Sequence, residues 1–164
     1  MKAYRIFVLL AALALAGGGC GSFDPSRVTV KLDKSWYYAV DTLPSIEVDI
    51  VGVGANDVDL WKRYSMTRYW SPRDRLRTDA EKEYGMHIMR FGHDKPLSQT
   101  LESDDPIWDR WYDADISTIF ILVNLDNITD REGDADPRRS IFPVETTAPN
   151  IEVIILPPAE ATKP

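Results

Sequence analysis

The pattern that most restricts the fold of this chain is an alternation of apolar and polar residues with a period of two. Val28, Val30 and Leu32 alternate with polar neighbours, and residues 46–50 repeat the pattern. Because successive side chains of a strand point to opposite faces, the alternation predicts strands buried on one face. Further strands are expected at residues 86–91, 116–125, 139–145 and 151–156. Strands of this number, separated by turn residues, predict a mainly β fold, an antiparallel β-sandwich.

Two segments have the pattern of short helices. Asn56 can cap a helix over residues 57–64, with two aspartates in its first turn, where the helix dipole favours negative charge. Asp105 can cap a second helix that begins with Pro106, a position where proline is tolerated. We therefore expect one or two short helices beside the strands.

The N-terminal segment has the pattern of an export signal. Lys2 and Arg5 precede an apolar run of eleven residues, Ile6 to Ala16, whereas a bilayer-spanning helix needs about 20. Three glycines and Cys20 follow the run. We expect four parts: a signal peptide at 1–19, a lipid-attachment site and tether at 20–27, a β-sandwich domain at 28–156, and a disordered tail at 157–164.

Cys20 is the only cysteine of the chain, so it has no partner for an intramolecular disulfide. The segment ending there resembles the lipobox of bacterial lipoproteins, although Gly17 stands where that motif has an aliphatic residue. The resemblance implies a diacylglyceryl thioether on Cys20 and a further fatty acyl chain, such as palmitate, on the new amino terminus. Several chains suffice for a stable lipid anchor. Ordinary signal cleavage that leaves a free thiol is the alternative.

The residue after the cysteine is Gly21 rather than aspartate, which favours transport to the outer membrane, with the domain facing the periplasm. The formal charge of the whole chain is −7, and removal of the two leader cations makes it more negative. Proteins that bind nucleic acid carry a basic surface, so nucleic acid is not an expected partner.

The sequence contains few residues suited to catalysis. It has two histidines, His87 in a predicted strand and His93 in a turn, and no G-x-S-x-G, H-E-x-x-H, Walker or C-x-x-C motif. Its acidic residues gather in polar segments such as 104–105 and 126–136, where solvent keeps carboxylates ordinary. We therefore expect no enzymatic activity, no cofactor and no small-molecule substrate. The 126–136 loop could offer oxygen ligands to calcium, but its spacing does not match an EF-hand.

A basic and aromatic segment spans residues 61–77, where the only acidic residue is Asp74. Its cations are Lys62, Arg63, Arg68, Arg73, Arg75 and Arg77, interleaved with Trp61, Tyr64, Tyr69 and Trp70. Tryptophan, tyrosine and arginine are enriched at protein-binding hot spots. We take Trp61, Arg63, Arg68, Tyr69 and Trp70 as candidate partner-binding residues. Alternatively, the segment binds lipid headgroups or envelope glycan, or its aromatics pack in the core while its arginines neutralise neighbouring acids.

The order of these elements resembles that of the outer-membrane lipoproteins of type VI secretion systems. The similarity covers about residues 16–156 and consists of a lipobox, the strand at 28–32, a loop, Pro44 to Ile50, a helical insertion around 60–64 and later strands such as 116–125. The longer basic insertion and the acidic 126–136 loop depart from that family's pattern.

The resemblance implies a transthyretin-like β-sandwich without enzymatic activity. It further implies that the protein holds a secretion complex to the outer membrane by binding the periplasmic part of an inner-membrane partner. Part of that contact is made by the loop between the first two strands, here residues 33–42, with Trp36, Tyr37 and Tyr38 as contact candidates. Since three adjacent aromatics cannot all point inward, at least one of them is expected at the surface.

From these observations we expect a membrane-anchored, non-enzymatic envelope scaffold that binds a periplasmic protein, of the kind found in type VI secretion. A binder of envelope glycan or lipid headgroups through the basic and aromatic segment is the alternative.

Overall fold

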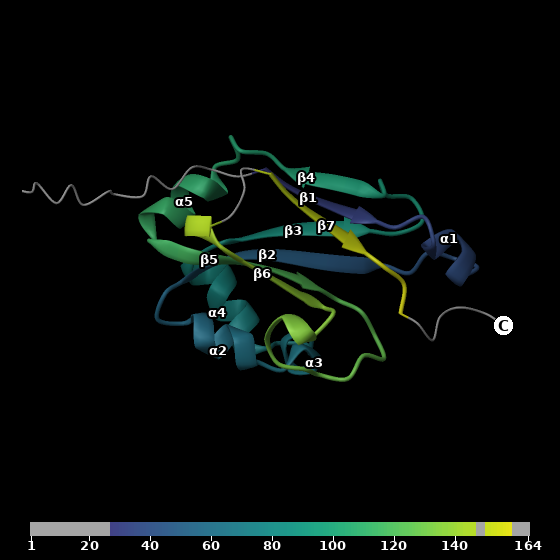
Figure 1. Cartoon of the computed structure of the whole chain (residues 1–164), viewed down its shortest axis with the longest axis horizontal. Helices are drawn as coiled ribbons and strands as arrows, with labels where there is room; N and C mark the ends of the chain where they lie inside the picture. The colour runs from purple at the N-terminus through teal and green to yellow at the C-terminus, as the bar shows by residue number, and fades with distance from the viewer. Residues whose placement is uncertain (1–26, 147–149, 159–164) are drawn as a thin grey trace, which may run out of the picture.

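The computed structural model describes residues 27–146 and 150–158, which form two facing β-sheets with short helices around them (Figure 1). Sheet A has three strands in the order β4 (Ser98–Leu101), β1 (Arg27–Leu32) and β7 (Asn150–Ile155). Sheet B has four strands in the order β3 (Met86–Phe91), β2 (Ile46–Gly54), β5 (Ile116–Val123) and β6 (Arg139–Pro143).

The helices of the described residues are short. They are α1 (Trp36–Ala39), α2 (Val58–Arg63), α3 (Met66–Tyr69), α4 (Arg75–Glu83) and α5 (Ile107–Asp113), with 3-10 turns η1 (Gly133–Ala135) and η2 (Val144–Thr146). Helices α2, α3 and α4 lie along the outer side of sheet B (Figure 1). Within the described part of the chain, no helix has the length and apolar character that crossing a membrane requires.

The side chains between the two sheets confirm the burial pattern that the alternation predicts. Val28, Val30 and Leu32 of β1 are buried, with exposed fractions of 0%, 0% and 4%. Gly52 of β2 leaves room for the aromatic side chains of this core, because a Cβ atom there would lie 2.9 Å from Cγ of Trp111. Sheet A is therefore buried on one face only, as the alternation predicts.

Sheet B is buried on both faces. Its outer face contributes Val51, Val53, Phe120 and Leu122 to a second apolar cluster, completed by Trp61, Met66, Tyr69 and Ala80 of the helices. This arrangement explains the unbroken apolar run at residues 119–123, since a strand covered on both sides has no polar face.

The fold is less purely antiparallel than predicted. Strands β1 and β7 pair in parallel, from Arg27 opposite Asn150 to Leu32 opposite Ile155. The two strands lie at opposite ends of the chain, so no hairpin forces them to be antiparallel. The expectation of one or two helices was also too low, because the described residues contain five. Strands still hold more residues than helices, so the fold is mixed, with two sheets and few short helices.

Candidate functional site

Helix α1 forms a turn at one end of the sandwich, which we call the distal turn (residues 33–42). The indole of Trp36 is 3% exposed, and its Nε1 donates a hydrogen bond of 3.0 Å to the carbonyl oxygen of Ile155. At the start of the turn, the carboxylate of Asp33 accepts a hydrogen bond of 2.8 Å from the backbone N–H of Ser35. The turn is therefore fixed to β7 by a buried aromatic side chain.

The two neighbouring aromatics of the distal turn point to solvent. Tyr37 is 62% exposed and Tyr38 is 86% exposed. The sequence predicted all three aromatics as contact candidates, and for Trp36 the structure corrects this, because only one side of so short a helical turn faces the core. Tyr37 and Tyr38 are the surface residues of the turn.

The distal turn and the start of the domain lie at opposite ends of β1. Arg27 begins β1 near α5, where its Nε donates a hydrogen bond of 2.7 Å to Glu102. Figure 1 shows α5 and the beginning of β1 at one end of the molecule and α1 at the other. A strand of six residues spans about 20 Å, so the exposed tyrosines lie roughly that far from Arg27.

The basic and aromatic segment does not form one continuous surface. Trp61 is 2% exposed and Tyr69 is 0% exposed. The ring of Trp61 lies 5.7 Å from that of Phe120 on sheet B, and the hydroxyl of Tyr69 donates to Asp49 at 2.9 Å. For these two residues the predicted surface role is wrong, because α2 and α3 carry them onto the apolar outer face of sheet B.

Arg77 neutralises acids on the same face of sheet B. Its Nε donates to Asp49 at 2.7 Å, and its guanidinium also bonds to Glu47. The guanidinium lies 4.7 Å above the ring of Trp70, which is partly buried. Burial alone would lower the pKa of Arg77, but the hydrogen bonds to the two carboxylates outweigh it and raise the pKa. Arg77 and Trp70 therefore stabilise the packing of α4 against sheet B.

Two of the predicted contact residues of this segment remain at the surface. The side chain of Arg68 is 70% exposed, lies 5.4 Å from the ring centre of Tyr64 and is 3.8 Å from the carboxylate of Asp74. Arg63 is exposed and donates to the carbonyl of Asp59 at 3.2 Å. The reading in which the arginines of this segment neutralise local acids describes Arg68 and Arg77.

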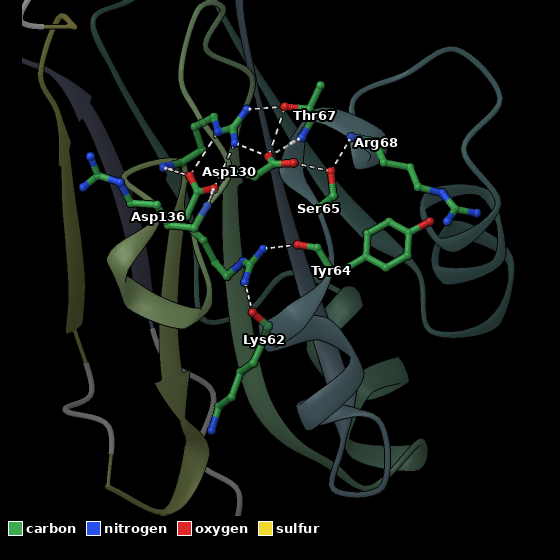
Figure 2. Close-up of polar contacts among 10 residues, drawn as sticks. Lys62, Tyr64, Ser65, Thr67, Arg68, Asp130 and Asp136 are labelled. Atoms are coloured by element: carbon green, nitrogen blue, oxygen red, sulfur yellow. Dashed lines mark hydrogen bonds and ion pairs between the residues drawn. The ribbon is translucent and has the colours of Figure 1, made fainter.

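A cluster of acids and arginines joins the loop before β6 to α3. Figure 2 shows the carboxylate of Asp130 accepting hydrogen bonds from Ser65 and Thr67. The same carboxylate accepts a hydrogen bond from the guanidinium of Arg138. Arg138 also pairs with Asp136 at 2.9 Å, and both of these side chains are almost completely buried. Partial burial would raise the pKa of Asp130, but the hydrogen bonds from Ser65, Thr67 and Arg138 lower it well below the usual range.

These contacts change the reading of the acidic 126–136 loop. Asp130 and Asp136 face the guanidinium of Arg138, a cation, where calcium would need several free oxygen ligands. Among the described residues, no group of three histidine, cysteine or acidic side chains is arranged to hold a metal ion. The carboxylates of this loop instead fix its position.

Arg139 was not singled out from the sequence. Its guanidinium donates to the backbone carbonyls of Lys62 and Tyr64. These carbonyls lie at the C-terminal end of α2, where a cation is favourable. Burial lowers the pKa of Arg139. The available signal was the pair of arginines, Arg138 and Arg139, at the start of a predicted strand. Both side chains are buried.

The histidines show ordinary surroundings. His87 lies in β3, where burial lowers its pKa, and its Nδ1 is 3.8 Å from the carboxylate of Asp105. His93 is exposed beside Asp94 in the turn that follows. Neither geometry favours a catalytic role. The lipidation residue predicted from the sequence, Cys20, lies outside the described residues.

Comparison with known proteins gives a distant similarity to a solved structure. No protein-family model matches the chain, and no curated protein matches it. Among solved structures, the chain is similar to Serratia marcescens Lip, described as a membrane-bound component of the type VI secretion system. The identity is 15%, the match covers 80% of this chain and 90% of that one, and the TM-score is 0.40. This is the family that the sequence resembles.

Proposed function

We propose that this chain is a lipid-anchored, non-enzymatic scaffold of the cell envelope that binds a periplasmic protein through its distal turn. The observation that carries the proposal is the pair of exposed tyrosines, Tyr37 and Tyr38, on a turn fixed by the buried indole of Trp36. Exposed aromatics on a preorganised backbone lose little conformational freedom on binding, which is the property of interface hot spots.

The position of the turn supports this role. Six residues lie between the proposed anchor at Cys20 and Arg27, a distance of at most about 25 Å when fully extended. The anchor therefore holds the α5 end of the domain near the membrane. Because the distal turn lies at the opposite end of β1, we propose that its tyrosines face away from the membrane, toward proteins of the periplasm.

For the partner we propose a subunit of a type VI secretion machine, and for the location the periplasmic face of the outer membrane. The support is the sequence resemblance, in which the loop between the first two strands contacts the periplasmic part of an inner-membrane protein. The lipobox and Gly21 after Cys20 support the anchor and its destination.

The proposal is tested by crosslinking the tagged protein in cells and recovering it from washed membranes. Three forms are compared: the unchanged chain, Cys20→Ser, and the double variant Tyr37→Ala with Tyr38→Ala. We expect one stoichiometric envelope protein with the unchanged chain and its loss with the tyrosine variant. The Cys20→Ser form should leave the membrane fraction. Recovery of the same protein with the tyrosine variant, or of lipid or glycan alone, would contradict the proposal.

A further inference from the structure

A second interaction surface is formed by β7 and the groove beside it. Strand β7 is the outermost strand of sheet A, paired with β1 on one side only. The carbonyl of Ile155 points to β1, since it accepts the backbone N–H of Asp33 at 3.0 Å. Backbone groups of successive strand residues point to alternate edges, so those of Glu152 and Ile154 point away from β1. Within residues 27–146 and 150–158, no strand pairs with these groups, so they form an unpaired edge of the described fold.

Among the edge strands of the described residues, β7 is the one that exposes a large apolar side chain. Edge strands usually carry charged residues or proline, or are very short, and so avoid pairing with other chains. Strand β4 is four residues long, β3 contains Arg90, and β6 ends at Pro143. Strand β7 contains one charged residue, Glu152, and leaves Ile154 54% exposed.

The unpaired edge borders an apolar groove of about 720 Å³. The groove lies where β7 passes the end of β5 and the loop that follows it. Its apolar lining includes Val123, Leu125, Ile128, Val153, Ile154 and Leu156, and polar residues such as Asp126, Thr129, Arg131 and Ser140 complete it. Leu156 is 62% exposed at its rim. A volume of this size is within the range of protein ligand pockets.

We propose that β7 and this groove bind an extended segment of a partner protein, which adds a strand to sheet A and places alternate apolar side chains in the groove. Main-chain hydrogen bonds supply affinity in this mode of recognition, and the pocket selects side chains. Pro157 and Pro158 cannot donate backbone hydrogen bonds, so they limit pairing to the preceding part of β7.

A second copy of this chain fits the surface less well. Two β7 edges could pair with each other, but the inward side chains of each β7, such as Ile151 and Ile155, already lie in the core of their own domain. Both grooves would stay unfilled. A separate extended segment can both form hydrogen bonds with the backbone edge of β7 and fill the groove. This segment is therefore the ligand expected at the surface.

The test uses the chain from residue 20 onward with Cys20→Ser, labelled for NMR. The probe is a ten-residue peptide of alternating valine and threonine with a lysine at each end. We expect its addition to shift and protect the amides of Glu152 and Ile154 and to shift the groove residue Ile128. The same peptide with alternate backbone nitrogens methylated should bind at least about tenfold more weakly, because it cannot pair with the edge.

Two variants complete the design. Ile154→Pro removes a donor of the free edge but none of the hydrogen bonds to β1, and it should weaken peptide binding at least about tenfold. The double variant Tyr37→Ala with Tyr38→Ala should bind the peptide unchanged, which separates this surface from the distal turn. The methylated peptide needs no protein variant, so the test holds even if Ile154→Pro fails to fold.

Three results would overturn the inference. The first is equal binding of the methylated peptide, or no binding of either peptide. The second is a concentration-dependent shift of the β7 amides without peptide, which would assign the edge to a second copy. The third is a clear gain in affinity when residues 159–164 are removed, which would show that the chain's own C-terminal end occupies the groove.

Discussion

The indole Nε1 of Trp36 donates a hydrogen bond of 3.0 Å to the carbonyl oxygen of Ile155, a residue 119 positions later in the chain. This contact joins the distal turn to the last strand and buries the indole, while the next two residues remain exposed. Trp36 thus stabilises the fold, whereas Tyr37 and Tyr38 are exposed to solvent. The two roles can be tested with separate variants.

The first prediction concerns the anchor of the turn. Trp36→Phe keeps an aromatic ring but removes the donor to Ile155, so unfolding free energy should fall by about 1–2 kcal/mol. Urea denaturation followed by circular dichroism measures the change. Tyr38→Ala is the matched control, because an 86% exposed side chain should contribute less than about 0.5 kcal/mol. Equal losses for both variants would contradict the division of roles.

The second prediction concerns the buried carboxylate of Asp49. Arg77→Ala leaves this fully buried acid without its cation, which should destabilise the fold by about 3 kcal/mol or more. Arg75→Ala is the control, since Arg75 pairs with Asp79 on the surface of the same helix and should contribute less than about 0.5 kcal/mol. A small effect at Arg77 would show that this ion pair does not hold α4 against sheet B.

The third prediction concerns the dependence of stability on pH. The pKa values of Asp130 and Asp136 are lowered in the folded chain, because hydrogen bonds outweigh the effect of burial. Those to Asp130 come from Ser65, Thr67 and Arg138, and those to Asp136 come mainly from Arg138. Such carboxylates stabilise the fold above their unfolded pKa, about 4, and this stabilisation is lost as pH falls through the folded values.

Melting temperature should therefore decline as pH falls below about 4. Asp130→Asn removes one titrating group of the cluster, so its melting temperature should depend less steeply on acid. An unchanged slope in this variant would mean that the hydrogen bonds from Ser65, Thr67 and Arg138 do not hold Asp130 in the charged form.

The fourth prediction concerns close packing at Gly52. Gly52→Ala places a methyl group 2.8 Å from Cδ1 of Ile116 and 2.9 Å from Cγ of Trp111, so it should destabilise the fold by about 1–3 kcal/mol. Gly54→Ala, two residues later in β2, meets nothing within 4 Å and should be nearly neutral. Thermal denaturation of the pair distinguishes steric crowding from a general effect of changing glycine.

Most strands could be predicted because their signal is local. The alternation at residues 28–32 and the apolar run at 119–123 depend only on which faces are buried. Strand β4 was missed because Ser98–Leu101 is short and mostly polar. The parallel pairing of β1 with β7 could not be predicted, since it depends on contacts between the two ends of the domain.

The helical layer was only partly predicted. The capping residues were present in the sequence, because Ser65 accepts from the N–H of Arg68 and Asp74 from that of Arg77. Both residues lie in the basic and aromatic segment 61–77, for which the sequence predicted a binding surface and no helix starts. The buried aromatics of α2 and α3 pack on the outer face of sheet B. The sequence alone does not show that these helices lie against that face, so it did not predict which aromatics are buried.

The central claim is that the distal turn binds a periplasmic protein. The most direct measurement uses the partner recovered by crosslinking and determines its affinity for two double variants of this chain. One variant combines Tyr37→Ala with Tyr38→Ala, and the matched variant combines Arg63→Ala with Arg68→Ala. We expect the tyrosine variant to weaken binding by at least about 30-fold, equivalent to about 2 kcal/mol, and the arginine variant to have little effect. Unchanged affinity for the tyrosine variant, with loss for the arginine variant, would contradict the account and place the interface on the helices.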